Sequence, residues 1–297
     1  MTAARLVLGV GATKAGSSWL HRFLSDHPEC HFRGIKEVHY FDAVAFDAYD
    51  AQIKQLAQTS GRLLARLAEQ PGKHENLNRQ LADAAELEAL FAQKRPDDAG
   101  YLAYLDRGRG DRPVIGDITP AYCLLPEPRM RAMAAIVPDV RVIYVLRDPV
   151  ARLWSHVRMM AGRRAEAPDE VPDRAHRILR RTLNGKERQI AIRSDYAGAL
   201  RRLRAAVPAD KLLVLFYEEM FTEDGAARIC HHLGIARRSA PVDEKVHEGP
   251  RVAAREDEQD AMRAWLAPQY DAVRRDLGRL PDAWHAHRTT APAGPMT

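Results

Sequence analysis

The stretch RLVLGVGATKAGSSWLHRFLS, residues 5–25, decides the fold class. Residues 5–10 are apolar and β-prone, a glycine-rich turn follows, and residues 17–25 have helical periodicity. The first amides of such a helix and the positive end of its dipole can hold a phosphate oxygen, and Lys14 adds a mobile positive charge.

In the Walker A pattern GxxxxGK[ST] the lysine follows the glycine, whereas here Lys14 precedes Gly16. The order of residues therefore does not favour an ordinary ATP kinase. A plain strand-to-helix turn explains the same residues without a ligand, so a second signal is needed.

The rest of the chain predicts an α/β fold. Four more β-prone runs, separated by helical patterns, occupy residues 30–33, 113–116, 140–146 and 211–217. Near-continuous apolar strands of this kind favour a mostly parallel sheet of about five strands with helices on both faces. We expect one domain, residues 1–288, and a loose tail at 289–297 that is rich in Ala, Pro and Thr.

Helical patterns also fill the spaces between the expected strands. A helical insertion should span about residues 46–107, broken at Pro71-Gly72 and Pro96. An Arg-rich helix is expected at about 169–184, and a last helix at about 256–277.

Composition excludes several classes of protein. The formal charge of +5 and pI near 9.2 suit a polyanionic nucleotide or an acidic acceptor, but nucleic-acid binding usually needs a denser basic patch. No window approaches the roughly 18 consecutive apolar residues of a membrane-spanning helix, and the N-terminus has no secretion signal. The three cysteines are widely spaced and form no CxxC pair, which favours a reducing cytoplasm. We therefore expect a cytoplasmic protein with no nucleic-acid partner and no integral membrane segment.

The second signal is an arginine at the end of the strand VRVIYVL. Asp148 can cap the following helix and Pro149 suits its first turn, so Arg147 should stand at the carboxyl edge of the sheet, where ligands of open α/β folds bind. A guanidinium can donate two parallel hydrogen bonds to a phosphate dianion, which a lysine ammonium cannot do. In the alternative interpretation, which involves no ligand, Arg147 forms a local ion pair with Asp148, and Ser155 lies on the helix surface.

These two segments resemble the sulfotransferases that use 3'-phosphoadenosine 5'-phosphosulfate (PAPS). Their 5'-phosphosulfate loop runs roughly T-x-P-K-S-G-T-T-W, matched here by Thr13-Lys14-x-Gly16-Ser17-Ser18-Trp19, and their 3'-phosphate is held by an arginine and a serine eight residues later. The resemblance implies a P-loop-like sulfotransferase fold and transfer of a sulfonate to a hydroxyl, or less readily an amine. It assigns PAPS binding to Lys14, Ala15, Gly16, Ser17, Ser18, Trp19, Arg147 and Ser155.

The segment Lys36-Glu37-Val38-His39-Tyr40-Phe41-Asp42 closely resembles K-E-x-H-F-F-D of the heparan sulfate O-sulfotransferases. That resemblance makes Glu37 the general base, with His39 and Asp42 in support. Lys14 would offset the charge on the departing phosphate. Glu37 would need its pKa raised to act near neutral pH, although Lys36 opposes this. No metal is needed.

Weaker matches extend over most of the remaining chain. Residues 116–122, GDITPAY, resemble E-K-[ST]-P-A-Y of the same enzymes, but Ile118 replaces a sulfate-contacting lysine, which argues against heparan-like acceptors. The resemblance further implies that Tyr196 reaches the nucleotide and that Arg251 belongs to a late donor-closing loop, although Pro250 interrupts its usual K-G-R order. Residues 280–284 resemble the C-terminal end of the sequences in this family.

Other interpretations stay open at this point. Lys36 and Glu37 form a solvated charged pair in the simplest alternative. A zinc site of His27, His31 and His39 has suitable spacing but lacks a carboxylate or thiolate partner set. A P-loop-type kinase and a non-catalytic binder of phosphorylated or sulfated ligands are the rival functions. The acceptor, which we expect to be a small molecule, lipid or carbohydrate, and the oligomeric state are not set by the sequence.

Overall fold

Five parallel strands form the centre of the molecule in the order β2-β3-β1-β4-β5. The computed structural model describes residues 4–69, 74–240 and 252–284. The strands are β1 (Arg5–Gly11), β2 (Cys30–Phe32), β3 (Val114–Ile118), β4 (Val140–Leu146) and β5 (Leu212–Phe216). The predicted strands are confirmed to within two residues at their ends, and the sheet is entirely rather than mostly parallel.

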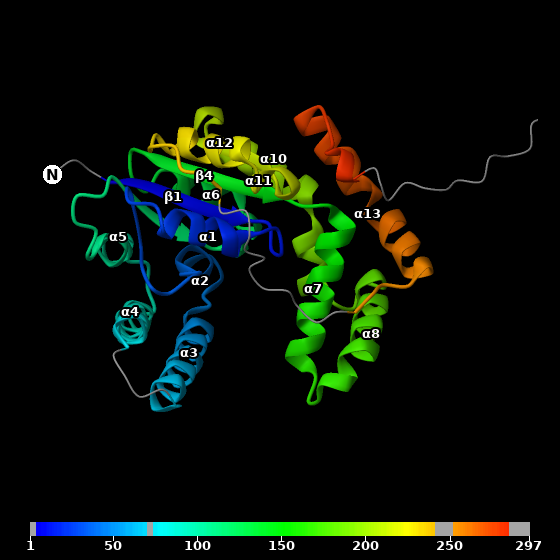
Figure 1. Ribbon diagram of the computed structural model, residues 1–297, viewed down its shortest axis with the longest axis horizontal. Helices are drawn as coiled ribbons and strands as arrows, with labels where there is room; N and C mark the ends of the chain where they lie inside the picture. The colour runs from blue at the N-terminus through cyan, green and yellow to red at the C-terminus, as the bar shows by residue number, and fades with distance from the viewer. Residues whose placement is uncertain (1–3, 70–73, 241–251, 285–297) are drawn as a thin grey trace, which may run out of the picture.

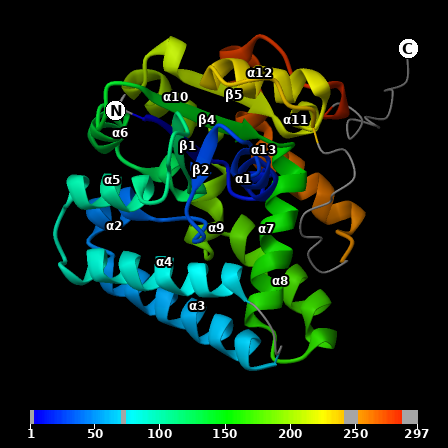
Figure 2. The same cartoon turned by 60° about the vertical axis from the view of Figure 1, so that its left-hand side comes forward.

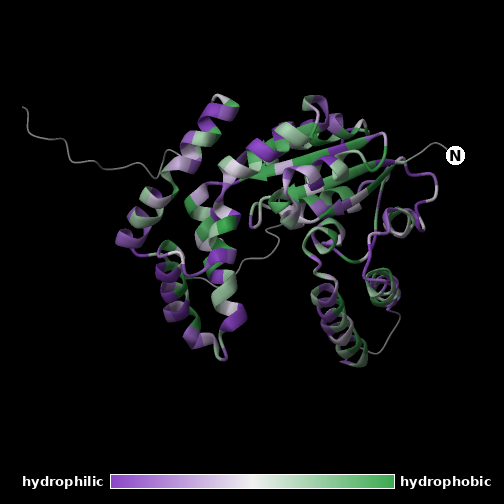
Figure 3. Cartoon of the chain, turned by 180° about the vertical axis from the view of Figure 1, so that it is seen from behind, coloured by the Kyte–Doolittle hydropathy of each residue, from purple (hydrophilic) through white to green (hydrophobic). Residues whose placement is uncertain are grey.

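The sheet is apolar because both of its faces are covered. Leu6, Val7, Leu8 and Val10 of the central strand β1 have no exposed surface. Figure 3 shows the strands coloured as hydrophobic over most of their length. Figure 1 shows α1 on one face of the sheet and α10 and α12 on the other. This is the layered α/β architecture that the near-continuous apolar runs predict.

The helices are distributed along the whole chain. Their bounds are α1 (Ser17–Ser25), α2 (Tyr40–Phe46), α3 (Tyr49–Glu69), α4 (Glu75–Ala92), α5 (Asp98–Asp106), α6 (Glu127–Ala134), α7 (Pro149–Arg164), α8 (Val171–Leu183), α9 (Arg188–Ala191), α10 (Tyr196–Ala206), α11 (Tyr217–Met220), α12 (Glu223–Leu233) and α13 (Glu256–Leu277). Short 3-10 helices lie at Pro120–Leu124, Pro168–Glu170, Ile192–Ser194, Ala209–Lys211 and Asp282–Trp284.

The predicted insertion consists mainly of α3 and α4, which lie side by side beneath the sheet (Figure 2). It is joined to the chain that follows β2 by buried charges. The guanidinium of Arg33 donates to Asp83 at 2.7 Å and to Glu86 at 2.6 Å, and the Gly34 amide donates to Asp83 at 2.5 Å. A charge-assisted network of this kind fixes α4 relative to residues 33–34, which directly precede Lys36 and Glu37.

The helices α7 and α8 project from the same side of the sheet as α3 and α4, and α13 runs from beside α8 up past α10 (Figure 1). Together α7, the predicted Arg-rich helix α8 and α13 share an apolar core that includes Leu153, Val157, Leu179 and Met262. Among the described residues, no helix is long and apolar enough to cross a membrane.

Candidate active site

The loop between β1 and α1 has a backbone that only certain residues adopt easily. Lys14 and Gly16 have φ values of +69° and +87°, in the left-handed region. A Cβ at Gly16 would lie 3.0 Å from the ring of Tyr217 and 2.6 Å from the end of Met220, so this glycine gives both the turn and the close packing. No side chain of the described residues caps α1, and the first amides of the helix remain available to a ligand.

Arg147 lies beside this loop, as the two-motif hypothesis requires. Its guanidinium donates to the carbonyl of Lys14 at 3.1 Å and stacks over the Tyr217 ring at 4.6 Å from the centroid. Tyr217 follows β5 and thus packs between Gly16 and Arg147, where it joins the two halves of the expected donor site. Sequence reasoning missed Tyr217, although its place at the carboxyl end of a strand was a usable signal.

The start of α7 is built as the sequence predicts. Asp148 accepts a hydrogen bond from the Ala151 amide at 2.7 Å and caps the helix, with Pro149 in the first turn. Tyr270 donates to the second carboxylate oxygen of Asp148 at 2.6 Å. Ser155 lies half-buried in the second turn of the same helix. Asp148 is therefore engaged in capping and leaves the Arg147 guanidinium to other partners.

Positive charge gathers around the loop. Burial lowers the pKa of Lys14, and the neighbouring cations Arg147, Arg163, Lys36 and Arg158 lower it further. Such mutual repulsion among cations is relieved when a multiply charged anion binds between them. The arrangement therefore favours a polyanionic ligand at this edge of the sheet.

Lys36, Glu37 and His39 form one hydrogen-bonded chain that reaches the loop. The ammonium of Lys36 donates to Ser18 at 2.9 Å, to Ser17 at 3.4 Å and to Glu37 at 3.2 Å. Nε2 of His39 lies 3.7 Å from Glu37, and its Nδ1 hydrogen-bonds to Asp42 at 2.8 Å. The predicted catalytic segment and the predicted donor loop are thus in direct contact through Lys36. Over a third of the Glu37 side chain, 36%, remains exposed and open to an incoming acceptor.

The charge state of this chain is set by its hydrogen-bonded partners. Burial alone would raise the pKa of Glu37, but the bonds with His39 and Lys36 outweigh it and lower the pKa to about 2. Burial alone would likewise lower the pKa of His39, but Asp42 and Glu37 hold its proton and raise the pKa to about 10. The opposing effect of Lys36 that the sequence indicated is therefore joined by that of His39, and two cations face one carboxylate.

Backbone strain marks the same residues. Among the described residues, five non-glycine positions have a positive φ, and Lys14, Glu37 and His39 are three of them. Each such conformation costs on the order of 1–2 kcal/mol, which the surrounding structure must offset. For residues 38–40 the support comes from β3 and its end. The carboxylate of Asp117 accepts bonds from Thr119 at 2.6 Å, Tyr122 at 2.6 Å and Tyr101 at 3.0 Å.

Asp117, Thr119 and Tyr122 also hold residues 38–40 by their backbone amides. The Val38 amide donates to Asp117 at 3.4 Å, the His39 amide to Thr119 at 3.4 Å, and the Tyr40 amide to Tyr122 at 3.0 Å. Asp117 is 2% exposed, and its burial raises its pKa despite the bonds that it accepts. The segment GDITPAY was recognised from its resemblance alone, and this positioning role of Asp117 was missed.

Comparison with known proteins identifies the family. A family model described as "Sulfotransferase family" matches residues 7–239, which is most of the chain and includes the loop, Glu37, Arg147 and Tyr217. This chain belongs to the sulfotransferase family. Membership implies PAPS as the sulfonate donor and an acceptor as the second substrate. No curated protein sequence shows significant similarity to this sulfotransferase.

Solved structures confirm the fold of this sulfotransferase. A sulfotransferase from Alicyclobacillus acidocaldarius superimposes with a TM-score of 0.61 at 20% identity, over 96% of this chain and 100% of the other. The sulfotransferase domain of the olefin synthase from Synechococcus PCC 7002 gives a TM-score of 0.51 at 17% identity, over 94% and 95% of the two chains. At these identities the likeness shows the shared α/β fold. It gives no support for membership of the heparan sulfate branch.

Several residues predicted to bind the donor of this sulfotransferase have other side-chain contacts. Trp19 is buried, and its ring stacks on Phe23 at 5.0 Å within the core. The Ala15 amide donates to the Ala12 carbonyl within the loop at 3.1 Å. Tyr196 is 1% exposed and its hydroxyl donates to the Arg147 carbonyl at 2.9 Å, so it supports Arg147 rather than facing a ligand. Arg251 lies outside the described residues.

The three histidines of the alternative metal reading do not converge. Nε2 of His27 hydrogen-bonds to the Ala236 carbonyl at 3.0 Å, and Nε2 of His31 to the Arg107 carbonyl at 2.9 Å. His39 is held by Asp42 and Glu37, as described above. The described part of the chain contains no group of three or more potential metal ligands.

Ile118 is 1% exposed and packs against Gly9, since a Cβ placed at Gly9 would lie 2.6 Å from the Ile118 side chain.

The raised pKa of His39 makes the stability of this sulfotransferase depend on pH. Its pKa moves from the ordinary 6.5 to about 10 on folding, so the stabilisation is complete below about pH 6.5 and is lost as the pH rises toward 10. We expect the Tm of the wild type to fall more between pH 6.5 and 10 than that of His39→Asn, since asparagine tolerates the positive φ but does not titrate. Thermal unfolding of both proteins across this range checks it. Parallel curves would contradict the assignment of a protonated His39.

Proposed function

We propose that this sulfotransferase transfers the sulfonate of PAPS to a hydroxyl, or less readily an amine, of a carbohydrate, lipid or other small acceptor, and releases PAP. The observation that carries the proposal is the contact of Arg147 with both Lys14 and Tyr217, because it joins the two sequence motifs at one edge of the sheet. In this arrangement the loop amides, Lys14, Ser17 and Ser18 face the 5'-phosphosulfate. Arg147 and Ser155 hold the 3'-phosphate.

Glu37 is the proposed general base. Its carboxylate takes the proton of the acceptor hydroxyl, whose oxygen attacks the sulfur of PAPS while the bond from sulfur to the bridging phosphate oxygen breaks. PAP leaves with that oxygen, and Lys14 offsets the negative charge that develops on it. His39 stays protonated and, with Asp42, holds the Glu37 carboxylate in place. In this proposal residues 36–42 have the same roles as in the heparan sulfate O-sulfotransferases, but heparan sulfate is not proposed as the acceptor.

The low pKa of Glu37 is compatible with this role because a bound donor changes the charges around the carboxylate. Lys36 contacts the donor loop and Glu37 at once, at 2.9 Å from Ser18 and 3.2 Å from Glu37. An anionic sulfonate bound at the loop competes for the Lys36 ammonium and adds a negative charge nearby. Both effects raise the pKa of Glu37 toward the range of an effective base.

The same low pKa is the observation that favours the second candidate, a non-catalytic binder of phosphorylated or sulfated ligands. In that case Glu37 is only the partner of Lys36 and His39. Formation of PAP from PAPS in the presence of an acceptor separates the two candidates, because a binder forms none.

Calorimetric titration with PAP tests the donor assignment directly. We expect PAP to bind, and ADP and AMP, which lack the 3'-phosphate, to bind about 10-fold to 100-fold more weakly, because each charge-assisted hydrogen bond to a phosphate contributes about 1.5–3 kcal/mol. Equal affinity for PAP and ADP would remove the role given to Arg147 and Ser155.

A further inference from the structure

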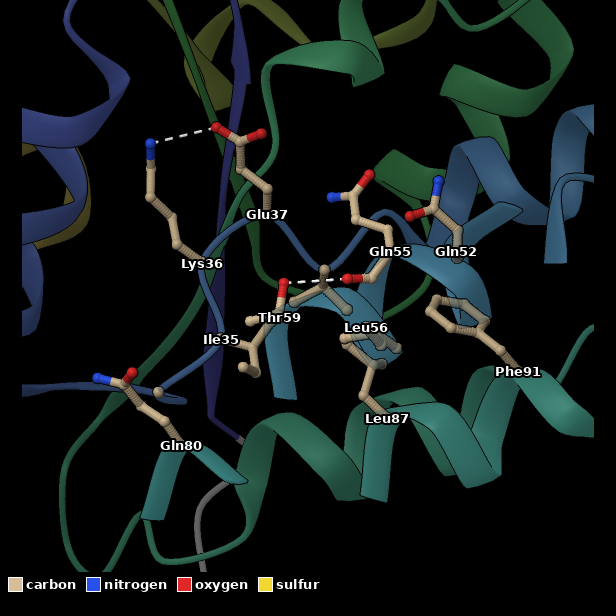
Figure 4. A pocket seen from close by; sticks show the side chains of 12 residues that line it. Ile35, Lys36, Glu37, Gln52, Gln55, Leu56, Thr59, Gln80, Leu87 and Phe91 are labelled. Carbon is tan, nitrogen blue, oxygen red and sulfur yellow. Dashed lines mark hydrogen bonds and ion pairs between the residues drawn. The ribbon is translucent and has the colours of Figure 1, made fainter. Parts of the chain in front are cut away.

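A pocket opens beside Glu37 between the catalytic segment and the helical insertion (Figure 4). Its volume is about 230 Å³, and Lys36 and Glu37 form part of its wall together with residues of α3 and α4. This is below the roughly 300–1,000 Å³ of sites that enclose a drug-sized ligand. The pocket is therefore sized for one part of an acceptor, the part next to the reacting hydroxyl.

Three glutamine side chains give the pocket its polar groups. Gln52 and Gln55 lie three residues apart on α3, with Thr59 four residues further on the same face, and Gln80 comes from α4. Within the described part of the chain, no hydrogen-bond partner is found for the three glutamine amides. An amide offers both donors and an acceptor and carries no charge. These groups are therefore available to hydroxyl or ether oxygens of a ligand.

The rest of the lining is apolar. Leu56, Leu87 and Phe91 are 6%, 1% and 1% exposed and form the base of the pocket, and the half-buried Ile35 adds a more exposed apolar edge (Figure 4). Contact with these apolar edges favours an acceptor with an apolar portion, because burial of apolar area releases about 25 cal/mol per Å². The pocket thus combines an apolar wall with uncharged polar groups.

Charge decides which acceptors fit. The charged lining residues are Lys36 and Glu37, 3.2 Å apart, and the other lining residues are neutral. In the proposed reaction Lys36 turns to the donor sulfonate and Glu37 takes the proton of the reacting hydroxyl, so neither is left to pair with another charge on the acceptor. A carboxylate or ammonium on the acceptor would lose hydration on entry without gaining an opposite charge. Loss of such a group's hydration is costly, whereas neutral hydroxyl groups exchange water for the glutamine amides at little cost.

We propose that this pocket selects an uncharged polyhydroxylated acceptor with an apolar portion, of the chemical type of a neutral alkyl glycoside. The proposal rests on the function proposed above, since it takes Glu37 as the base. In it Gln52, Gln55 and Gln80 are specificity-determining residues that bind the non-reacting hydroxyls. The hydrogen bonds of residues 33–34 to Asp83 hold α4, which forms one wall of the pocket, in position relative to Glu37.

A matched set of glycosides tests the charge selection. Octyl β-D-glucopyranoside, its glucuronide and its 2-amino-2-deoxy analogue share the ring and chain. Each analogue replaces one hydroxyl-bearing group with a charged group, the 6-CH2OH with a carboxylate or the 2-OH with an ammonium, at different positions of the ring, and D-glucose lacks the chain. With PAPS as donor, below micelle-forming concentrations, we expect kcat/KM to be about tenfold or more higher for the neutral octyl glycoside than for either charged analogue and for glucose. Equal or faster transfer to a charged analogue would overturn the proposal.

Two variants of α3 test whether the pocket lining causes the selection against charged acceptors. Gln55→Lys is expected to raise kcat/KM for the glucuronide relative to the neutral glycoside by about tenfold, because it supplies the missing cation. Gln58→Lys, an exposed position outside the pocket lining, is the control and should leave the ratio unchanged. Equal shifts in both variants would contradict a role for the pocket.

PAP binding in the same preparations separates this proposal from the function on which it rests. If PAP binds but neither binding nor sulfation of the neutral glycoside occurs, the acceptor class is wrong and the sulfotransferase assignment stands. If PAP fails to bind, the proposed donor site itself is wrong.

Discussion

Glu37→Gln is expected to lower turnover by a factor of about 100 to 10,000 while leaving PAP affinity within about threefold of wild type, since general base catalysis typically contributes that factor. The amide keeps the shape of the carboxylate and can still accept a hydrogen bond from Lys36, but it cannot take a proton. Release of PAP from PAPS with an acceptor measures turnover, and calorimetry measures PAP binding.

The matched control is Glu69→Gln, which neutralises an exposed carboxylate near the end of α3. It should leave both quantities unchanged. Wild-type turnover in Glu37→Gln would remove Glu37 as the base and favour an acceptor activated by another group. A parallel loss of PAP affinity would instead show that Glu37 acts through Lys36 and the donor loop.

Arg147→Ala is expected to weaken PAP binding by roughly 10-fold to 100-fold and to leave ADP binding nearly unchanged, so that the preference for a 3'-phosphate is lost. The loss corresponds to one or more charge-assisted hydrogen bonds of about 1.5–3 kcal/mol each. Arg147→Lys should recover only part of it, since lysine lacks the planar fork and stacks less well on Tyr217. Titrations of each variant with PAP and ADP measure the effect.

The control for a general change in positive charge is Arg201→Ala, at an exposed position of α10. It should retain the full preference for PAP. If Arg147→Ala weakens PAP and ADP equally, the arginine acts by supporting the loop through the Lys14 carbonyl rather than by binding the 3'-phosphate.

Local signals in the sequence were sufficient for the five strands and for the starts of the two helices at the candidate site. Apolar runs predicted the five strands, and the glycine-rich turn predicted the start of α1 at Ser17. Asp148 and Pro149 predicted the start of α7 in the same way. Each of these features depends on neighbouring residues, so a pattern within about ten positions reveals it.

Contacts between distant segments could not be predicted in this way. The stacking of Tyr217 on Arg147 joins positions 70 apart, and the bond from Tyr122 to the Tyr40 amide joins positions 82 apart. The strand order that creates these contacts has no local signature. The sign of the pKa change at Glu37 also depends on which cations surround it in space, and the sequence placed only Lys36 beside it.

The support of residues 38–40 by Asp117, Thr119 and Tyr122 has a consequence for how this enzyme can diversify. Glu37, the proposed base, adjoins residues 38–40, which are held by residues at the end of β3, whereas the glutamines proposed to bind the acceptor belong to α3 and α4. In this proposal chemistry and specificity are carried by separate parts of the chain. Exchange of the α3 and α4 pair is therefore expected to change the acceptor range, provided that Asp83 and Glu86, which bond to Arg33, are retained.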